Sequence, residues 1–390
     1  MSIVPVYIIS ARRSALGRIG GLHRNRRLDA LAAPIVEAVL ADAGVAPDQI
    51  DELALGNATE SGNPARLLAL ASGLAETAAA LTIDRQCASG LDAVVHGVRA
   101  IATGSADLVL AGGAESLSTA PWRIARPRNP QQMPHFLHVD PSFAETHGDG
   151  AGEPQPFAAS QALANRLAIS RAAQDDYAFT SHSRAEAARE ARRFTGEIVA
   201  LRANAEEARD QNATGPDRDA FDDAMPFVAG NGTLTPANTS PLTDGAAFAL
   251  LASQAAWESL GRPAALRMSA YSSLGVAPAD EAASPILATQ KLLSRLGGLS
   301  PAAIGIVEMS ETSAAQALAF ATALHVDPAR ISPEGGAIAR GHPLGAAGPV
   351  LLARLFTALV RNPGPDAPTN GLATLGALGG IGVAALFERV

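Results

Sequence analysis

Short apolar runs alternate with helical apolar spacing in the first third of the chain. Residues 4–10 (VPVYIIS) predict a strand, and residues 31–45 (LAAPIVEAVLADAGV) have the apolar spacing of a helix. Two more strands are predicted at 52–58 (ELALGNA) and 106–116 (ADLVLAGGAES). Between them, a helix is predicted by apolar residues three or four positions apart: Leu91, Val94, Val98 and Ile101. This order favours parallel strands joined by right-handed crossovers.

The pattern changes between residues 117 and 240, where prolines interrupt the chain and 169–193 reads as a long polar helix. Such a segment predicts an insertion that lies over the main body. Strand character resumes at 242–253 (LTDGAAFALLAS), and a second strand–helix series begins at 304–311 (IGIVEMSE). Two halves of similar order favour an internally duplicated α/β fold. The predicted divisions are 1–116 (first half, first part), 117–240 (inserted loop domain), 241–262 (first half, last strand and connection) and 263–390 (second half).

Composition excludes several classes of protein. Hydrophobic residues make up 47% and charged residues 17% of the chain, which is typical of a soluble protein with a large core. A net charge of −8 argues against nucleic-acid binding, and a single cysteine excludes an internal disulfide or a cysteine-based metal cluster, so no metal is expected. The N-terminus places its apolar run before its arginines, unlike a signal peptide. No stretch approaches the roughly 18 continuous apolar residues of a membrane span. We expect a cytoplasmic protein with no membrane partner.

Cys87, the one cysteine, stands where a predicted strand gives way to a helix. Ala88, Ser89 and Gly90 follow it, so a bulky group can approach the sulfur. A helix N-terminus offers free N–H groups and a positive potential, which lower a thiol pKa and stabilise an oxyanion. Cys87 is therefore a candidate nucleophile, and the alternative is a small buried hydrophobic residue.

A second candidate is His342, in the glycine-rich segment 335–348 (GGAIARGHPLGAAG). Glycines let the backbone approach a ligand closely, and a histidine here could take the thiol proton of Cys87. The alternative is an ordinary loop histidine. The C-terminal glycines, Gly380 among them, could form a loop of backbone donors near a bound thioester.

Several long motifs resemble those of the thiolase family, and the resemblance covers essentially the whole chain. DRQCASGLDAV resembles the nucleophile motif NxxCGSGLxA, and AGGAESLSTAPW resembles GGMESMSxAP. NTSPLTDGAA is similar to NASGxNDGAA, and GGAIARGHPLGAAG is similar to GGAIALGHPxGASG. The motifs also occur in the family's order.

This resemblance implies a five-layered αβαβα fold of two similar halves with an inserted loop domain. It implies an acyltransferase that makes or cleaves 3-ketoacyl-CoA, with coenzyme A thioesters as substrates and no permanently bound cofactor. Cys87 matches the acylated nucleophile and His342 the histidine that activates it, while Ser269 matches a serine that contacts coenzyme A. A homodimer or homotetramer is also implied.

Other positions depart from the family's motifs. The second cysteine, in CxGGG, handles the α-carbon proton, and Gly376 stands in its place. NEAF becomes SETS, so that Ser310 replaces an asparagine that holds a water in an oxyanion hole, followed by Glu311. MGxGP becomes EAASP, with Glu281 at the methionine. Ser310, Glu311 and Gly380 are therefore candidates for an oxyanion hole or for the second step.

These departures leave three interpretations. The first is an acyltransferase that acylates Cys87 and has an altered second step, because Gly376 cannot act as a base. It could form a carbon–carbon bond by a rearranged route, condense with a decarboxylating malonyl-type partner, or transfer the acyl group to oxygen, nitrogen or water. The second is a non-catalytic subunit, against which Cys87 and His342 argue. The third, a dinucleotide-dependent oxidoreductase, lacks an early glycine fingerprint.

Overall fold

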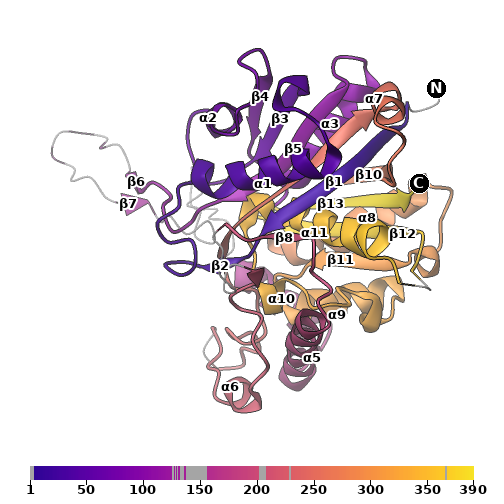
Figure 1. The fold of residues 1–390 in the computed structure, drawn as a ribbon. Helices are drawn as coiled ribbons and strands as arrows, with labels where there is room; N and C mark the ends of the chain where they lie inside the picture. The colour runs from indigo at the N-terminus through magenta and orange to yellow at the C-terminus, as the bar shows by residue number, and fades with distance from the viewer. Residues whose placement is uncertain are drawn as a thin grey trace.

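The computed structural model describes residues 4–124, 127, 129, 131, 136–137, 156–201, 208–227, 230–364 and 367–390. Two strand sets make up its framework (Figure 1). The first set is β1 (Val6–Ser14), β3 (Glu52–Gly56), β4 (Ala79–Ile83), β5 (Leu108–Glu115) and β9 (Thr243–Ser253). The second set is β10 (Leu266–Gly275), β11 (Ile306–Ser310), β12 (Asn370–Ala377) and β13 (Ile381–Arg389).

The strands follow the order β11-β12-β13-β10-β1-β9-β5-β3-β4. The two sets meet edge to edge at β1 and β10, which pair antiparallel at Tyr7↔Arg267 and Ile8↔Leu266. β3 is parallel to β4 and β5, and β11 is parallel to β12, as the strand–helix order predicts. β9 is instead antiparallel to β5 and β1, because it follows the long insertion rather than a crossover helix. Two short strands pair outside this order, β2 (Gly17–Arg18) with β9 and β8 (Ile198–Val199) with β1, while β6 (Arg123–Ile124) and β7 (Phe136–Leu137) form a separate two-stranded sheet.

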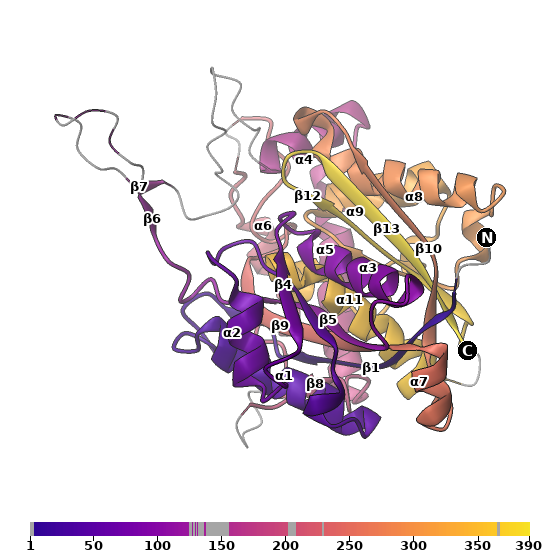
Figure 2. The ribbon, with the colours of Figure 1, turned by 90° about the horizontal axis from the view of Figure 1, so that it is seen from above.

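Helices lie outside and between the two strand sets (Figure 2). α1 and α2 cover the outer face of the first set, α8 packs on β10, β12 and β13 with α9 beside it, and α3 and α11 lie between the sets. The predicted five-layered α/β fold is thereby confirmed. These helices are α1 (Leu28–Ala43), α2 (Pro64–Ala71), α3 (Ser89–Ala102), α8 (Ser284–Arg295), α9 (Ala314–Leu324) and α11 (Ala347–Phe356), with α7 (Gln254–Ser259) at one end of β9.

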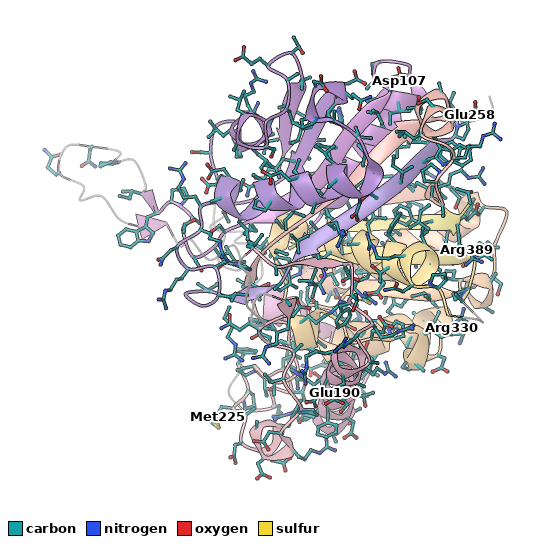
Figure 3. The ribbon with its side chains drawn as sticks, in the orientation of Figure 1. Asp107, Glu190, Met225, Glu258, Arg330 and Arg389 are labelled. Atoms are coloured by element: carbon teal, nitrogen blue, oxygen red, sulfur yellow. The ribbon has the colours of Figure 1, made fainter. Side chains whose placement is uncertain are left out.

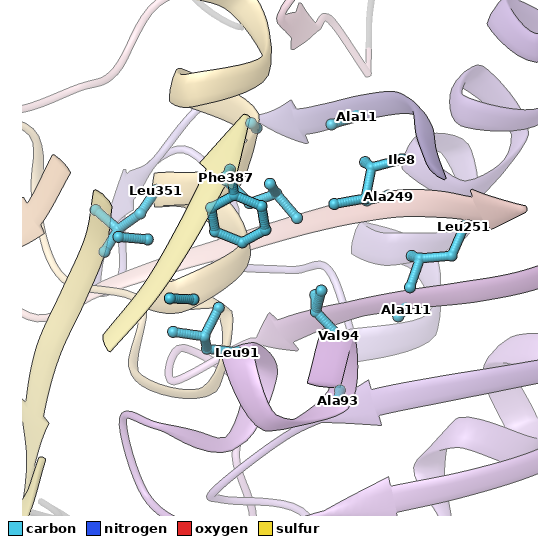
Figure 4. Close-up of a cluster of buried hydrophobic side chains, with 14 of the residues drawn as sticks. Ile8, Ala11, Leu91, Ala93, Val94, Ala111, Ala249, Leu251, Leu351 and Phe387 are labelled. Carbon is cyan, nitrogen blue, oxygen red and sulfur yellow. The ribbon is translucent and has the colours of Figure 1, made fainter. Parts of the chain in front are cut away.

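One buried cluster joins the central helices to both strand sets. Leu91 of α3, Leu351 of α11, Phe387 of β13 and Leu251 of β9 all belong to it (Figure 4). Charged residues such as Arg389 lie at the periphery instead (Figure 3). All ten residues of α11 are buried, so this helix lacks a polar face.

The segment Leu344–Arg361, which contains α11, is long and apolar enough to cross a membrane. It is not a continuous apolar run, because Arg354 interrupts it, so the expectation of no such run is not contradicted. Within the protein 83% of it is buried, which is how the central helix of a layered fold behaves. Its composition is explained by packing on two faces rather than by contact with lipid.

The inserted region contributes α4 (Pro156–Arg166), α5 (Arg171–Glu190) and α6 (Arg218–Asp222). α4 packs on α9, and α5 packs on both α9 and the short helix α10 (Ala337–Arg340). Buried ion pairs fasten the segment that follows α5 to the core: Glu197 contacts Arg13 of β1 at 2.6 Å and also contacts Arg354 of α11. The insertion therefore lies against the segment that leads into His342.

Candidate active site

Cys87 lies in a tight turn between β4 and the start of α3. Gln86, the residue before it, has a positive φ of 54°, which a non-glycine residue rarely adopts. Ser89 stabilises the turn, because its Oγ accepts from Arg85 N at 2.7 Å and donates to Gln86 O at 2.5 Å. The thiol is therefore held at the beginning of a helix, as the sequence predicts, by a backbone shape that local hydrogen bonds maintain.

His342 is fixed through its backbone to the segment that leads into β9. His342 N donates to Pro241 O at 2.8 Å, and Thr243 N donates to His342 O at 3.1 Å. Gly341 before it has a φ of 117°, and a Cβ there would lie 2.2 Å from Thr243 Cγ2. Only glycine fits at this position, so the glycine-rich sequence serves to bring the histidine loop against this segment.

Close backbone contacts bring the Cys87 turn and the His342 loop together. A Cβ at Gly90 would lie 2.3 Å from Gly345 O, and one at Gly113 would lie 2.2 Å from the same oxygen. Gly345 N also donates to the buried carboxylate of Glu115 at 3.0 Å. The start of α3, the end of β5 and the histidine loop therefore meet at a distance that larger residues would prevent.

The result is a chain of three buried polar side chains. Cys87 Sγ lies 3.0 Å from His342 Nε2, and His342 Nδ1 lies 2.8 Å from Ser310 Oγ. For Nε2 to accept the thiol proton, Nδ1 must carry the ring proton, and its N–H then donates a hydrogen bond to Ser310 Oγ. The serine hydroxyl can also donate, so Ser310 can stabilise either tautomer of the neutral ring. Ser310 thus contacts His342 directly, whereas the resemblance implied a water-holding role.

Burial determines the charge state of this pair. It raises the pKa of the Cys87 thiol to about 12, with a further increase from the negative charge of Glu281, against the opposing effect of the Leu378 and Cys87 N–H groups. Burial also lowers the pKa of His342 to about 4. The expectation that the helix start lowers the thiol pKa is therefore wrong, because desolvation is larger than the helix effect. At neutral pH the pair is a thiol beside a neutral imidazole.

Backbone donors surround the sulfur. Both the Leu378 N–H and the N–H of Cys87 itself stabilise a negative sulfur, so both are candidate donors to a carbonyl oxygen that develops charge on Cys87. Gly380, the predicted donor, is not among the groups that act on the Cys87 sulfur, and its carbonyl accepts from Val276 N at 2.7 Å. The sequence gives no signal for Leu378, because the family motif has a glycine at that position and a backbone N–H is independent of the side chain.

Two other predicted site residues lie away from Cys87. Glu311 is fully buried, where its carboxylate accepts from Tyr177 Oη at 2.8 Å and Ile338 N at 3.4 Å, so it joins the insertion to the histidine loop. Burial raises its pKa. Ser269 lies on β10, where its Oγ donates to Leu386 O at 3.3 Å. Neither residue lines the cavity at Cys87, although Ser240 does.

A cavity of about 350 Å³ opens beside Cys87 and His342. Its wall is mostly apolar and comes from both halves and from the insertion. Glu281 is the only carboxylate among the described residues that line it. The lining residues are Ile19, Cys87, Phe157, Phe227, Pro236, Thr239, Ser240, Pro241, Leu242, Glu281, Thr312, His342, Leu344 and Leu378.

Family models match nearly the whole chain: the thiolase N-terminal domain over residues 6–255 and the thiolase C-terminal domain over 262–389. The chain belongs to the thiolase family. It is 34% identical to the acetyl-CoA acetyltransferase of Pseudomonas aeruginosa, over 98% of this chain and 99% of that protein. It is 36% identical to the Rhizobium meliloti acetyl-CoA acetyltransferase over the full length of both. The crystal structure of the Bacillus anthracis acetyl-CoA acetyltransferase matches with a TM-score of 0.91 at 29% identity, covering 100% and 99% of the two chains.

Gly376, at the motif position of the second thiolase cysteine, is closely surrounded by other side chains. A Cβ on Gly376 would lie 2.9 Å from Ser284 Oγ and 3.5 Å from Gln316 Nε2. Ser284 Oγ is held in place by donating to Ile381 O at 2.9 Å. Ser284 itself stands at the second glycine of the thiolase motif MGxGP. The space beside Gly376 is therefore occupied by the Ser284 side chain, which the motif glycine at this position would lack.

Among the described residues, no group of three or more His, Cys, Asp or Glu side chains could hold a metal ion.

Proposed function

We propose that this thiolase is a coenzyme A-dependent acyltransferase that carries the acyl group as a thioester on Cys87. One observation supports it above all: Cys87 Sγ lies 3.0 Å from His342 Nε2 at the wall of an apolar cavity. A nucleophile in hydrogen-bond contact with a base that a third group orients is the arrangement of covalent catalysis. A non-catalytic subunit has no use for this contact.

The first half-reaction follows from the neutral pair. As His342 Nε2 takes the thiol proton, Cys87 Sγ attacks the carbonyl carbon of an acyl-CoA thioester. The oxygen gains negative charge, which the Leu378 and Cys87 N–H groups stabilise. The bond to the coenzyme A sulfur then breaks, and that sulfur takes the proton from His342. The products are acyl-Cys87 and free coenzyme A, with His342 neutral again.

The second half-reaction in our proposal is Claisen or retro-Claisen chemistry, the class to which the names of the acetyl-CoA acetyltransferase relatives belong. It requires removal of a proton from the α-carbon of a second thioester, a weak acid. Gly376 supplies no side chain for this step. That observation favours a second candidate, in which the acyl group passes to oxygen, nitrogen or water, or to a decarboxylating malonyl-type partner.

The test of acyl transfer is intact mass spectrometry after incubation with acetyl-CoA and with longer acyl-CoA esters. We expect one acyl group per chain on the native protein and none on C87S. The absence of an adduct with every thioester would refute the proposal. Because the cavity is mostly apolar, the same series of esters also measures which chain lengths it accepts.

The proposal includes a homodimer or homotetramer. β4 lies at the end of the sheet order and pairs only with β3 among the described strands, and its residues are exposed or half-buried. Unpaired strand edges are places where a second copy can add to a sheet. Light scattering on the native chain gives the assembly directly, and a monomer at working concentration would contradict this part of the proposal.

A further inference from the structure

Glu281 lies on a short 3₁₀ turn, Pro278–Ala283, that is anchored on two sides. Gln316 Nε2 donates to Ala282 O at 3.2 Å from within the core. Ser284 Oγ, just after the turn, donates to Ile381 O at 2.9 Å. The turn is therefore fixed with respect to α9 and β13, and Glu281 does not depend on a loose loop for its position.

The two side chains that anchor this turn are those that crowd Gly376. Ser284 Oγ and Gln316 Nε2 are the polar atoms nearest to where a Cβ at residue 376 would lie. The changes at Gly376, Ser284 and Glu281 therefore belong to one packing unit. The space left by a missing cysteine is filled by the serine that helps to hold the turn carrying the carboxylate.

Glu281 is only 6% exposed, yet it lines the same apolar cavity as Cys87, His342 and Leu378. Its carboxylate is close enough to Cys87 for its charge to raise the thiol pKa. A negative charge there hinders formation of the thiolate, so it works against the first half-reaction. Its place on the wall of this cavity makes it a candidate base for the later step.

We infer that Glu281 is the base that removes the α-proton in the second half-reaction, on the wall of the cavity where Gly376 leaves no thiol. This inference rests on the proposed acylation of Cys87. It makes Glu281 a catalytic residue, because its carboxylate would contact the reacting carbon of the second acyl-CoA. The substrate class is then a thioester with at least one α-hydrogen.

The step balances with the residues present. The Glu281 carboxylate accepts a proton from the α-carbon of the second acyl-CoA, leaving an enolate whose oxygen needs a donor. His342 can supply its Nε2–H in the tautomer in which Nδ1 accepts from the Ser310 hydroxyl. The α-carbon forms a bond to the acyl carbonyl on Cys87, the bond to Sγ breaks, and the proton on Glu281 returns to the sulfur. The product is 3-ketoacyl-CoA, and Cys87 is again a thiol.

The experiment separates the two half-reactions. Native protein and E281Q are incubated with acetyl-CoA in deuterated water, and deuterium in the acetyl methyl group is followed by mass spectrometry beside acetylation of Cys87. We expect E281Q to acetylate Cys87 at least as well as the native protein but to exchange the methyl protons about 10²–10⁴-fold more slowly. Preserved acetylation also shows that E281Q is folded.

D280N is the matched control, because Asp280 lies on the same turn but is exposed and contacts Arg166 at 2.9 Å. It should leave exchange unchanged. Equal exchange in E281Q and native protein, or no exchange in native protein that acetylates Cys87, would refute the role of Glu281 and favour the second candidate function. If E281Q fails to acetylate Cys87, E281D is compared by the same ratio of exchange to acetylation. Failure of all proteins to acetylate refutes the proposed function instead.

Discussion

The two sides of the active-site cavity differ in how their residues are held. Cys87 and His342 are fixed by backbone: a positive φ at Gln86, a glycine-only contact at Gly341, and the close approach around Gly345. Gly376 and Ser284, beside the turn that carries Glu281, are instead related by side-chain packing. Backbone contacts this close tolerate almost no change, whereas side-chain volume can be exchanged between neighbours.

This difference explains the linked departures from the thiolase motifs at Gly376, Ser284 and Glu281. An altered residue at Gly341 would displace the histidine loop, since a Cβ there would lie 2.2 Å from Thr243. A cysteine lost at residue 376 leaves a gap that one added hydroxyl group, on Ser284, can fill. The backbone around Cys87 and His342 is therefore constrained by the fold itself. The side chains at Gly376, Ser284 and Glu281 can instead change together.

The largest expected effect is that of His342→Gln. Loss of the base should slow acetylation of Cys87 by about 10²–10⁴-fold, measured by rapid quenching and intact mass, while His325→Gln, at an exposed helix end, should change nothing. Since burial lowers the pKa of His342 to about 4, the ring is the neutral base above that pH. Acetylation by the native protein should thus show no step near pH 6.5 and should decline only as pH falls toward 4. If acetylation slowed by less than tenfold in H342Q, His342 would not be the base, and the proposed difference between the two sides of the cavity would not hold.

The next effect tests whether Gly376, Ser284 and Glu281 form one unit. G376C alone should lower the melting temperature, because overpacking against Ser284 Oγ at 2.9 Å costs about 1–3 kcal/mol. G376C/S284A removes that contact, leaving Pro285 Cδ at 3.4 Å as the nearest neighbour after it.

Placed in E281Q, the pair G376C/S284A should restore methyl-proton exchange by about 10²-fold, since a thiol again stands where thiolases keep one. S284A/E281Q is the control, and it should remain slow. A triple variant that folds and acetylates Cys87 without regaining exchange would show that the two positions do not substitute for one another.

The fold could be predicted from the sequence because its signals are local and repeated. Strand and helix periodicity gave the order of elements, and long motifs gave the layered arrangement, which is confirmed. The antiparallel direction of β9 was not predicted, because it depends on where the chain re-enters the sheet after the insertion.

Roles at the site were harder to predict than positions. The motifs singled out Cys87 and His342, which the structure places 3.0 Å apart. The thiol pKa was predicted in the wrong direction, because a helix N-terminus is visible in a sequence and the depth of burial is not. Glu311 was a candidate for the second step, but its partner Tyr177 comes from 134 positions away. A contact between residues so far apart in the sequence produces no pattern in the local spacing of residue types.

A smaller effect is expected from Ser310→Ala. The hydroxyl contacts His342 Nδ1 at 2.8 Å, and one such hydrogen bond is worth about 0.5–1.5 kcal/mol, so acetylation should slow by about two- to tenfold. Because Ser310 positions the ring, the variant should also change the ratio of His342 tautomers in nitrogen NMR spectra. S259A, an exposed serine on α7, is the control. An unchanged tautomer ratio would mean that the ring is held by its surroundings alone.

The smallest effect is expected from E281Q, a single variant that tests both sides of the cavity. Glu281 raises the pKa of the Cys87 thiol, so E281Q, which removes that negative charge, should lower it and increase the thiolate fraction at any pH below the pKa. Alkylation of Cys87 by iodoacetamide at pH 8–9 should then be about two- to tenfold faster, since one pKa unit corresponds to tenfold in thiolate. D280N, with its exposed charge, should alkylate at the native rate. The same substitution would thereby favour the first half-reaction and impair the second. Alkylation at the native rate in E281Q would show that the carboxylate does not act on the sulfur and that the two sides function independently.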